Sequence, residues 1–434
     1  MKNEFILQKI WEQHSFLPNN LKTTDNKSLE IIEFGTINHS NGPDFINAKV
    51  KIDNQIHAGD VEIHYLSSTW HQHQHQHDPR YNRVILHVVW KHDQEIQTQN
   101  NSTIHTLELK SRVTSSLLQH LVSQPELPIC SNELRRVPEK VISQQFEMAS
   151  KELIKVKTLE IMKIHASLGD DWWKTWFWLH LKSFLGPMNH SAAIQITERV
   201  SKRYVMSCKT PNDIIAYLFG LSGWISGSLT DETTDDYTLL LQQKFDFFRF
   251  KHEWVSPFDI QWNYKQVRPS SFPQLRMAQF AIWLFESESN FEFLTDIHSF
   301  QWNQEFQKFK KIADPYWETH YQLGKTSKSH TNKIGKNTIA TIAINCWYYG
   351  LYAYAKAMQN PNYEVLANMF LKYLPVETNR HTKWMNQLFK RGKNMKGSQE
   401  LMAQYKLFCS KKACSKCLIG MEILQGTFMK YQQL

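Results

Sequence analysis

The amino-acid sequence contains no long apolar segment. Its apolar runs fall well short of the roughly 18–20 residues that a membrane-spanning helix requires, so we expect no membrane partner. Charged residues stand among the apolar ones at the N-terminus, which lacks the hydrophobic stretch of a signal peptide. Cysteine is scarce, with 6 in 434 residues, and three of these crowd near the C-terminus, unlike the disulfide framework of a small secreted domain. These absences predict a cytoplasmic protein.

Hydrophobic residues are nevertheless abundant. They make up 41% of the chain and aromatic residues 13%, including 15 Trp, which is ample material for packed cores and argues against disorder over most of the length. A length of 434 residues allows two or three domains of ordinary size. The formal charge of +9 and the isoelectric point of about 9.0 favour a polyanionic partner, and we expect nucleic acid. Protein partners stay open.

Alternating polar and apolar residues dominate the first 111 residues. A helix is expected over residues 4–14, because its apolar residues repeat at helical spacing. Strands are expected where apolar residues alternate or run together between turn-forming residues, at 29–34, 45–52, 57–66, 83–90 and 104–109. The polar residues 70–82 lie between the third and fourth strands as a helix or loop. The predicted order is α-β-β-β-α-β, with one further strand.

Helical periodicity replaces this pattern from about residue 112. Helices are expected at 113–123, 139–167, 171–185, 191–206, 211–220, 235–249 and 273–286, and again between 338 and 430. The polar, basic stretch 324–337 contains two glycines and is expected to be an exposed loop or linker. The chain is therefore predicted to be an α+β protein, with an α/β core at 1–111, a helical domain at 112–323, the linker at 324–337 and a helical region at 338–434.

Two short segments of the predicted core carry acidic residues in a pattern that suits a metal ion. The sequence GPDF at 42–45 opens the second strand, and DVEIH at 60–64 lies within the third. Alternate side chains of a strand share a face, so Asp60, Glu62 and His64 point the same way. Carboxylates on neighbouring strands bind Mg²⁺ or Mn²⁺ and leave coordination positions for water and phosphate. The alternative is that the first segment only forms a capped turn and the second lines a solvated sheet face.

This order of elements and this spacing of carboxylates resemble the core of the PD-(D/E)xK nuclease superfamily. The resemblance implies a restriction-endonuclease-like fold in which Asp44 and Glu62 bind the metal and the residue two positions after the glutamate orients the attacking water. His64 stands where the superfamily has lysine, and Glu33 on the first strand would add a carboxylate. A neutral imidazole accepts a proton or binds metal, but it is a weaker fixed cation than lysine. The core therefore fits either a nuclease or an inactive nucleic-acid-binding protein.

A run of alternating histidines, WHQHQHQHD at 70–78, follows the third strand. If this run is extended, its four imidazoles share one face, and histidine with a nearby aspartate suits Zn²⁺ or another transition ion. A helix at this place would overhang the carboxylates. His73, His75 and Asp78 would then contact a scissile phosphate or a second metal. The alternative, which we favour for His71 and His77, is a short low-complexity stretch of exposed polar residues.

Three cysteines form a C-x₄-C-x₂-C array at Cys409, Cys414 and Cys417. Thiols this close in a cytoplasmic chain are typical metal ligands. A fourth ligand would close a zinc site or complete an iron–sulfur site, and the candidates are a histidine, Cys130, Cys208 and Cys346. Some PD-(D/E)xK nucleases hold an iron–sulfur cluster with one remote cysteine and three near the C-terminus, and this resemblance implies Cys130. The two remaining cysteines are predicted to be small buried hydrophobic residues.

Basic and aromatic residues supply further candidates for nucleic-acid contacts. Ten Lys or Arg face one acid, Glu400, between Arg380 and Lys416, which suits phosphate neutralisation or an ordinary solvated surface. The sequence WWKTWFW at 172–178 has helical spacing, so we expect core packing rather than base stacking. Arg268 and Arg276 flank the start of a predicted helix and are expected to hold a phosphate there.

Over nearly its full length, the chain resembles a bacterial family known only as a domain of unknown function. The shared pieces are GPDF at 42–45, GDVEIH at 59–64, Trp70 with His73, His75 and Asp78, Tyr81-Asn82, VILHVV at 84–89, RPxxFP at 268–273, and Cys409, Cys414, Cys417 and Gly420. This family implies no activity. Our leading expectation is a metal-dependent nuclease acting on DNA or RNA. The alternatives are the inactive nucleic-acid binder and a zinc-stabilised helical scaffold that binds another protein.

Overall fold

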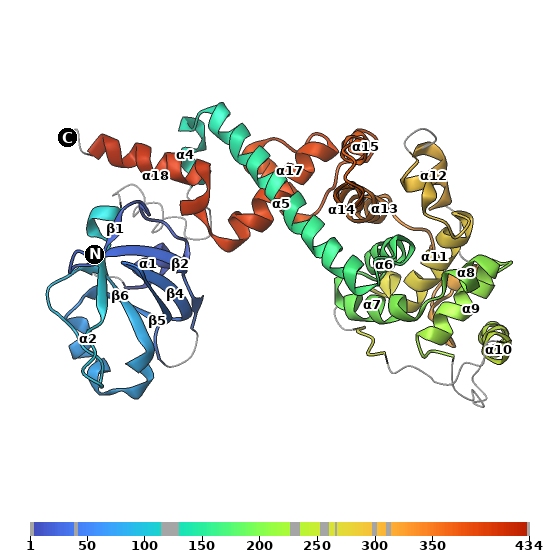
Figure 1. The fold of residues 1–434 in the computed structure, drawn as a ribbon, viewed down its shortest axis with the longest axis horizontal. Helices are drawn as coiled ribbons and strands as arrows, with labels where there is room; N and C mark the ends of the chain where they lie inside the picture. The colour runs from blue at the N-terminus through green and yellow to red at the C-terminus, as the bar shows by residue number, and fades with distance from the viewer. Residues whose placement is uncertain are drawn as a thin grey trace. The chain divides into compact units, whose positions relative to one another are not determined.

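The computed structural model describes residues 4–38, 42–113, 130–225, 235–251, 260–264, 267–296, 302–309 and 314–431. The chain divides into two compact units. One unit joins residues 1–150 to residues 400–434, and the other comprises residues 151–399. The first unit carries the large β-sheet, and the second is almost entirely helical (Figure 1). The mixed α+β class expected from the sequence is confirmed.

Seven strands form one sheet in the first unit. They are β1 (Leu21–Lys22), β2 (Ser28–Glu33), β3 (Thr36–Ile37), β4 (Phe45–Ile52), β5 (Gln55–Leu66), β6 (Val84–Lys91) and β7 (His105–Glu108). Their order is β1-β2-β4-β5-β6-β7, with β3 beside β4. Pairing is antiparallel from β1 to β5 and parallel from β5 to β7. The change of direction requires a crossover between β5 and β6, because parallel neighbours cannot be joined by a hairpin.

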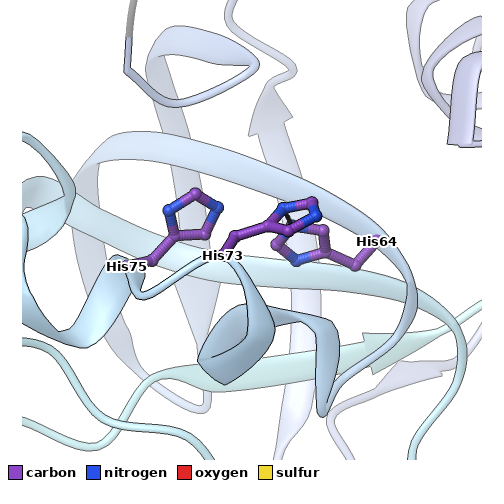
Figure 2. A group of neighbouring side chains, drawn as sticks. All are labelled: His64, His73 and His75. Atoms are coloured by element: carbon purple, nitrogen blue, oxygen red, sulfur yellow. Dashed lines mark hydrogen bonds between the residues drawn. The ribbon is translucent and has the colours of Figure 1, made fainter.

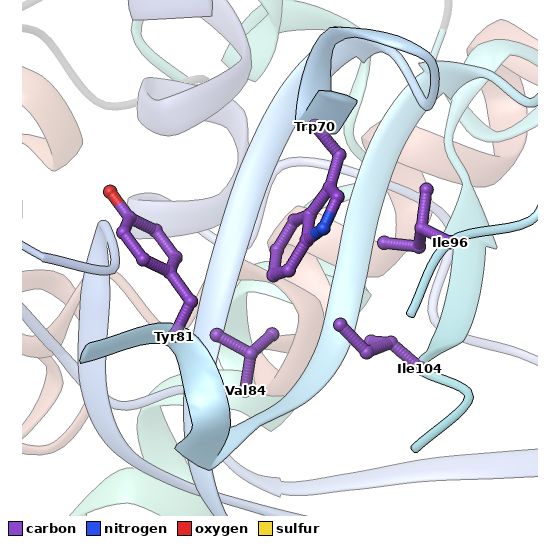
Figure 3. Close-up of a cluster of buried hydrophobic side chains, with 5 residues drawn as sticks. All are labelled: Trp70, Tyr81, Val84, Ile96 and Ile104. Carbon is purple, nitrogen blue, oxygen red and sulfur yellow. The ribbon is translucent and has the colours of Figure 1, made fainter. Parts of the chain in front are cut away.

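The crossover consists of short turns of helix rather than one long helix. It contains α2 (Thr69–Gln72) and the 3₁₀ turns η1 (His75–His77) and η2 (Pro79–Arg83). Trp70 is fully buried in a cluster with Tyr81, Val84, Ile96 and Ile104 (Figure 3), and its Nε1 donates to the carbonyl of Gln97 at 3.0 Å. This buried cluster fixes the crossover against the parallel end of the sheet.

Helix α1 (Glu4–Glu12) packs on β5. Its buried residues are Ile6, Leu7, Ile10 and Trp11, which recur at helical spacing and form one apolar face. The N–H of the Trp11 indole donates to the carbonyl of Phe34 at 3.0 Å, which ties the helix to the end of β2. The polar edge of α1 is thereby held beside the segment that enters β4.

The rest of the described chain is helical. The principal helices are α4 (Cys130–Glu133), α5 (Glu139–Ser167), α6 (Trp172–Leu185), α7 (His190–Arg199), α8 (Lys202–Ser207), α9 (Pro211–Leu221), α10 (Asp236–Lys251), α11 (Pro273–Glu286), α12 (Trp302–Lys308), α13 (Lys336–Ala343), α14 (Tyr349–Met358), α15 (Asn362–Phe370), α16 (Arg380–Phe389), α17 (Met395–Leu407) and α18 (Leu418–Tyr431). A small hairpin pairs β8 (His320–Gln322) with β9 (Lys325–Thr326). In the described residues, no helix combines the length and apolarity needed to cross a membrane.

The helical segments follow the predicted periodicity closely. The helix expected at 191–206 is divided into α7 and α8, because the backbone is extended at Val200 and Ser201. The helix expected at 113–123 lies almost wholly outside the described residues. The stretch 324–337 starts in the β8–β9 turn and ends in the first turn of α13. Trp173, Trp176 and Trp178 are buried, so the expected core packing of this tryptophan run is confirmed.

Candidate metal centre

Asp44 and Glu62 lie side by side on neighbouring strands. Asp44 immediately precedes β4, whose first residue Phe45 pairs with Val61 of β5. The backbone N–H of Asp44 donates to Glu62 Oε2 at 2.9 Å, and the N–H of Ile63 donates to Asp44 Oδ2 at 3.1 Å. The sheet itself therefore sets the separation and orientation of these two carboxyl groups.

The surroundings of these carboxyl groups disfavour their charged forms. Burial raises the pKa of Glu62 to about 8. Burial, and then the charge of Glu62, raise the pKa of Asp44 to about 7, although Gln8 of α1 donates to Asp44 Oδ1 at 2.7 Å. Two adjacent carboxyl groups of this kind retain protons near neutral pH, and a bound cation would replace those protons.

Three histidines meet beside Glu62 (Figure 2). His64 follows it on β5, whereas His73 and His75 come from the crossover, and potential ligand atoms of all three lie within 4.8 Å of one another. The crossover is not extended here. Gln74 has a left-handed backbone, with φ 59°, and this turn brings His73 and His75 to the same point.

Glu62 Oε1 faces the histidine group. It lies 3.5 Å from His64 Nε2 and 3.3 Å from His75 Nε2, and His64 Nε2 lies 3.3 Å from His73 Nδ1. His75 is buried, and its Nε2 approaches Glu62 Oε1 without forming a hydrogen bond within the described structure. A buried ring nitrogen that makes no hydrogen bond is costly unless it binds something else. The three imidazoles, with the Glu62 carboxyl group beside those of His64 and His75, are therefore a donor set that fits a metal ion.

Two imidazoles of this group, those of His64 and His75, are held in the neutral form. Burial, together with the neighbouring His87, His75 and His73, lowers the pKa of His64 to about 2. Burial lowers the pKa of His75 and brings that of His87 to about 3. A neutral imidazole keeps a lone pair for a metal ion, whereas it cannot act as a fixed cation. His64 is therefore better suited to metal binding than to the role of the superfamily lysine.

His87 and Gln8 belong to this site although the sequence pattern did not single them out. His87 Nε2 lies 2.8 Å from His64 Nδ1 and thereby orients the His64 ring. His87 is fully buried in β6, amid the apolar run VILHVVW. A single polar residue within an apolar strand that is covered on both faces needs a hydrogen-bond partner, and this was the signal that could have identified His87. Gln8, at the polar edge of α1, carried no comparable signal.

Asp60 and Glu33 are not brought into the metal centre. Asp60 is buried, and its Oδ1 accepts from the backbone N–H of Asn47 at 3.1 Å. Asn47 has φ 57° at an irregularity of β4, so Asp60 stabilises that bulge. Glu33 is exposed and lies opposite Lys49 in the register of β2 and β4. Lys49 is four residues from Phe45, about 13 Å along the strand at roughly 3.3 Å per residue, so Glu33 is far from Asp44. Three of the five carboxylate and histidine candidates thus converge: Asp44, Glu62 and His64.

Of the remaining candidate residues on the crossover, His73 and His75 lie in the histidine group and the others do not. Asp78 caps η2 by accepting from the N–H of Arg80 and forms an ion pair with that arginine, whose hydrogen bonds lower the pKa of Asp78 to about 2. These contacts give Asp78 a structural role. His77 is exposed and His71 half-buried, and the structure places neither within the histidine group. The expectation of a metal-binding or phosphate-binding place for His73 and His75 stays a prediction.

Arg268 and Arg276 lie in the helical unit. Arg268 is exposed, and Arg276 is buried on α11, where it donates to Gln279 Oε1 at 3.0 Å and to Ser271 Oγ at 3.1 Å. Burial lowers the pKa of Arg276 to about 10. These neutral partners hold the loop before α11 in place, so Arg276 has a structural function that the sequence did not predict. A phosphate contact remains a prediction for both arginines.

The basic residues between Arg380 and Lys416 belong to both units, because the division falls between Gln399 and Glu400. Lys406, Lys411 and Lys416 are exposed in the unit that contains the sheet. In that same unit, Lys412 pairs with Glu12 of α1 at 2.5 Å. This basic segment is therefore not described as one surface.

The chain belongs to the family described as "Protein of unknown function (DUF2851)", whose model matches residues 4–380. The match includes every residue of the carboxylate and histidine group and ends before the C-terminal cysteines. No curated protein matches the chain, and no solved structure matches it. The family assignment confirms the resemblance to a domain of unknown function, and it carries no activity.

Proposed function

We propose that this protein is a metal-dependent phosphodiester hydrolase that acts on DNA or RNA. The observation that carries the proposal is the pairing of Asp44 and Glu62 through a backbone hydrogen bond, directly beside three clustered histidines. The residues that would hold a metal come from β5 on one side and from the crossover on the other, and the exposed His73 would leave the site accessible to substrate. A helix, α1, is followed by strands β1 to β5, the crossover helix α2 and strands β6 and β7, an order that contains the expected α-β-β-β-α-β sequence with two additional short strands and supports a PD-(D/E)xK-like core.

The donor atoms favour Mn²⁺ or another first-row transition ion over Mg²⁺. Mg²⁺ prefers oxygen ligands, whereas imidazole nitrogens with carboxylate oxygens suit manganese, iron or zinc. Glu62, His64, His73 and His75 would hold the ion, with Asp44 beside them. When bound, the ion supplies Lewis-acid activation of a phosphate oxygen and lowers the pKa of a bound water.

The protein side chains have distinct tasks in this proposal. Asp44 and Glu62 give up their protons to receive the cation, which their raised pKa values link to pH. His87 orients His64, and Gln8 fixes one oxygen of Asp44. The net charge of +9 supports a polyanionic substrate.

Cleavage of labelled single- and double-stranded DNA and RNA tests this function. We expect cleavage that requires Mn²⁺, that is weaker with Mg²⁺ and that falls by at least a hundredfold in Glu62→Gln. Glu30→Gln is the matched control, because Glu30 is an exposed carboxylate on β2 of the same sheet. Equal cleavage by both variants would show that activity comes from elsewhere or from a contaminant.

An inactive nucleic-acid-binding protein is the second candidate. The observation that favours it is the neutral His64 in place of a lysine, since no fixed cation then stands beside the carboxylates. Binding of nucleic acid by wild type and by Glu62→Gln, without cleavage by either, would support this candidate. Absence of both binding and cleavage would favour the protein-binding scaffold.

A further inference from the structure

Four cysteines from the two ends of the sheet-bearing unit meet around one helix junction. Cys130 begins α4, Cys409 begins the 3₁₀ turn η10 (Cys409–Lys411), and Cys414 begins η11 (Cys414–Lys416). Cys417 follows directly, and α18 then begins and packs against both α4 and η11. The arrangement joins the segment after the sheet to the C-terminal segment.

Hydrogen-bond donors are aimed at the sulfur atoms. The Gln404 amide on α17 donates from Nε2 to Cys417 Sγ at 3.4 Å and to Cys409 Sγ at 3.7 Å. Gln404 is held by Gln145 of α5, whose Nε2 donates to Gln404 Oε1 at 2.7 Å, while Gln145 Oε1 accepts from the N–H of Leu418 at 2.8 Å. Both glutamines are buried, with exposed fractions of 0% and 1%. Buried amides are retained where their hydrogen bonds are needed.

Backbone N–H groups at this junction also form hydrogen bonds with a cysteine sulfur. The backbone N–H groups of Gly420 and Ile419 donate to Cys417 Sγ. Gly420 allows this close turn, because a Cβ at that position would lie 2.1 Å from the carbonyl oxygen of Cys414. A thiol is a weak hydrogen-bond acceptor and a thiolate a strong one, so these donors are suited to thiolates.

The four sulfurs are close enough to interact electrostatically, Cys130 with Cys409, Cys414 and Cys417, and Cys414 with Cys409 and Cys417. Thiolates gathered in a buried place need a positive centre among them.

The spacing of the sulfurs distinguishes between two kinds of centre. Four thiolates bound about 2.3 Å from one Zn²⁺ would lie about 3.8 Å from one another. In the part of the chain that the structure describes, which includes all four cysteines, three potential ligand atoms come within 4.8 Å of one another at the histidine site alone. No three of the sulfurs are as close as a single zinc ion requires. An iron–sulfur cluster places its thiolates on different irons and so holds them farther apart.

We propose that Cys130, Cys409, Cys414 and Cys417 bind an iron–sulfur cluster through all four thiolates, with Gln404 donating to two of the sulfurs. The cluster is a structural staple that holds α4 against α18 and joins the two chain segments of the sheet-bearing unit. This site is separate from the carboxylate and histidine group and does not depend on the proposed hydrolase activity.

Metal and sulfide analysis of the full-length protein, purified without oxygen, tests the proposal. We expect iron and acid-labile sulfide in similar amounts, together with visible absorbance that disappears on oxidation. One zinc per chain without sulfide would overturn the proposal, and so would the absence of both metals. This result needs no variant, so it stands even if substitutions impair folding.

Single substitutions then assign the ligands. Cys130→Ser and Cys409→Ser should lose most of the iron and sulfide, whereas Cys208→Ser should keep both, because Cys208 lies in the helical unit. Gln404→Leu should retain the cluster but make its reduction potential more negative, because the donors to sulfur are lost. Full iron content in Cys130→Ser would contradict the four-cysteine site, and an unchanged potential in Gln404→Leu would contradict the role of the amide.

Discussion

The carboxyl groups of Asp44 and Glu62 take their properties from where the sheet places them. Each accepts a backbone hydrogen bond, yet burial outweighs these bonds and raises the pKa of both groups. His64 shows the opposite shift for the same reason, since burial disfavours its charged form. Burial therefore favours the protonated, neutral form of Asp44 and Glu62 and the deprotonated, neutral form of His64. A bound divalent cation would favour the ionised form of the two carboxyl groups.

Stability of the metal-free protein should fall as the pH rises above neutrality. The folded state keeps protons on Asp44 and Glu62 up to about pH 7 and 8, whereas the unfolded chain releases them near pH 4. The buried histidines act in the opposite direction, but only below their ordinary pKa of 6.5. Between pH 6.5 and 8, of these groups only the carboxyl groups of Asp44 and Glu62 still hold more protons in the folded than in the unfolded state. The free energy of unfolding should therefore decrease as the pH rises through this range.

Thermal melting in the presence of a chelator from pH 6.5 to 8 measures this effect. The melting temperature should drop by several degrees in wild type and by less in Asp44→Asn. Adding Mn²⁺ should remove the drop. A wild-type profile that is flat, or one that rises, would contradict the buried-carboxyl description. Glu30→Gln should behave like wild type, because its side chain is exposed.

His87 is expected to act as a positioning residue for the metal. Its Nε2 contacts His64 Nδ1 at 2.8 Å, and partners of this kind typically change metal affinity by about 10–100-fold when they are removed. His87→Phe should therefore weaken Mn²⁺ binding by that factor in calorimetric titration. His77→Phe is the control, because His77 is exposed and outside the group. Equal weakening in both variants would rule out the positioning role.

Among the elements, the crossover between β5 and β6 decides whether the histidines assemble. Its start is fixed by Asp93, whose Oδ1 accepts from the N–H of Ser68 at 2.9 Å. Its middle is fixed by Trp70, and His75 stacks on Tyr81 with ring centroids 3.8 Å apart. The crossover is short and well packed, so it holds its two candidate metal ligands, His73 and His75, in fixed positions.

Removal of the Trp70 side chain should destabilise the sheet-bearing unit. Trp→Ala in a core costs about 3–5 kcal/mol, and this indole also loses its hydrogen bond to Gln97. Trp70→Ala should shift the denaturant unfolding midpoint of that unit well below that of wild type and weaken Mn²⁺ binding. Trp90→Ala offers a comparison on the same sheet, because Trp90 is only half-buried and should cost less. Comparable losses in the two variants would contradict the anchoring role of Trp70.

Local periodicity was enough to predict most helices and strands. Helices α5 and α11 have the predicted bounds, 139–167 and 273–286, and β4 spans the predicted 45–52. The site was only partly predictable. Asp44, Glu62 and His64 could be grouped because strand spacing is regular. The contact that Asp60 makes depends on a bulge at Asn47, which no sequence pattern predicts.

The positions of the crossover histidines depend on two helical turns, α2 and η1, and on the left-handed Gln74 between them. Alternation at 71–77 indicated a shared face in an extended chain, whereas the left-handed Gln74 folds the run back on itself. His87 was hidden within an apolar strand, and its role depends on its contact with a residue of the next strand. Tertiary contacts of this kind lie beyond periodicity, because they join residues whose sequence separation is arbitrary.

At the scale of the whole molecule, the sheet-bearing unit holds both candidate centres and both ends of the chain. The carboxylate and histidine group depends on residues between 8 and 87, and the cysteine group depends on Cys130, Gln145 and residues 404–420 of the same unit. Exposed lysines of this unit lie in the same compact body as the candidate metal centre, so we expect them to attract the proposed polyanionic substrate.

Nucleic-acid binding should depend on lysines of the sheet-bearing unit more than on those of the helical unit. The triple variant Lys406→Gln, Lys411→Gln and Lys416→Gln removes three exposed charges from the former. Its control removes three exposed charges from the latter, at Lys202, Lys325 and Lys328. The logarithmic salt dependence of DNA affinity should become shallower by roughly 0.9 for each lysine that contacts a phosphate. Both variants change the net charge equally, so equal slopes would mean that overall charge, and not this part of the molecule, attracts the nucleic acid.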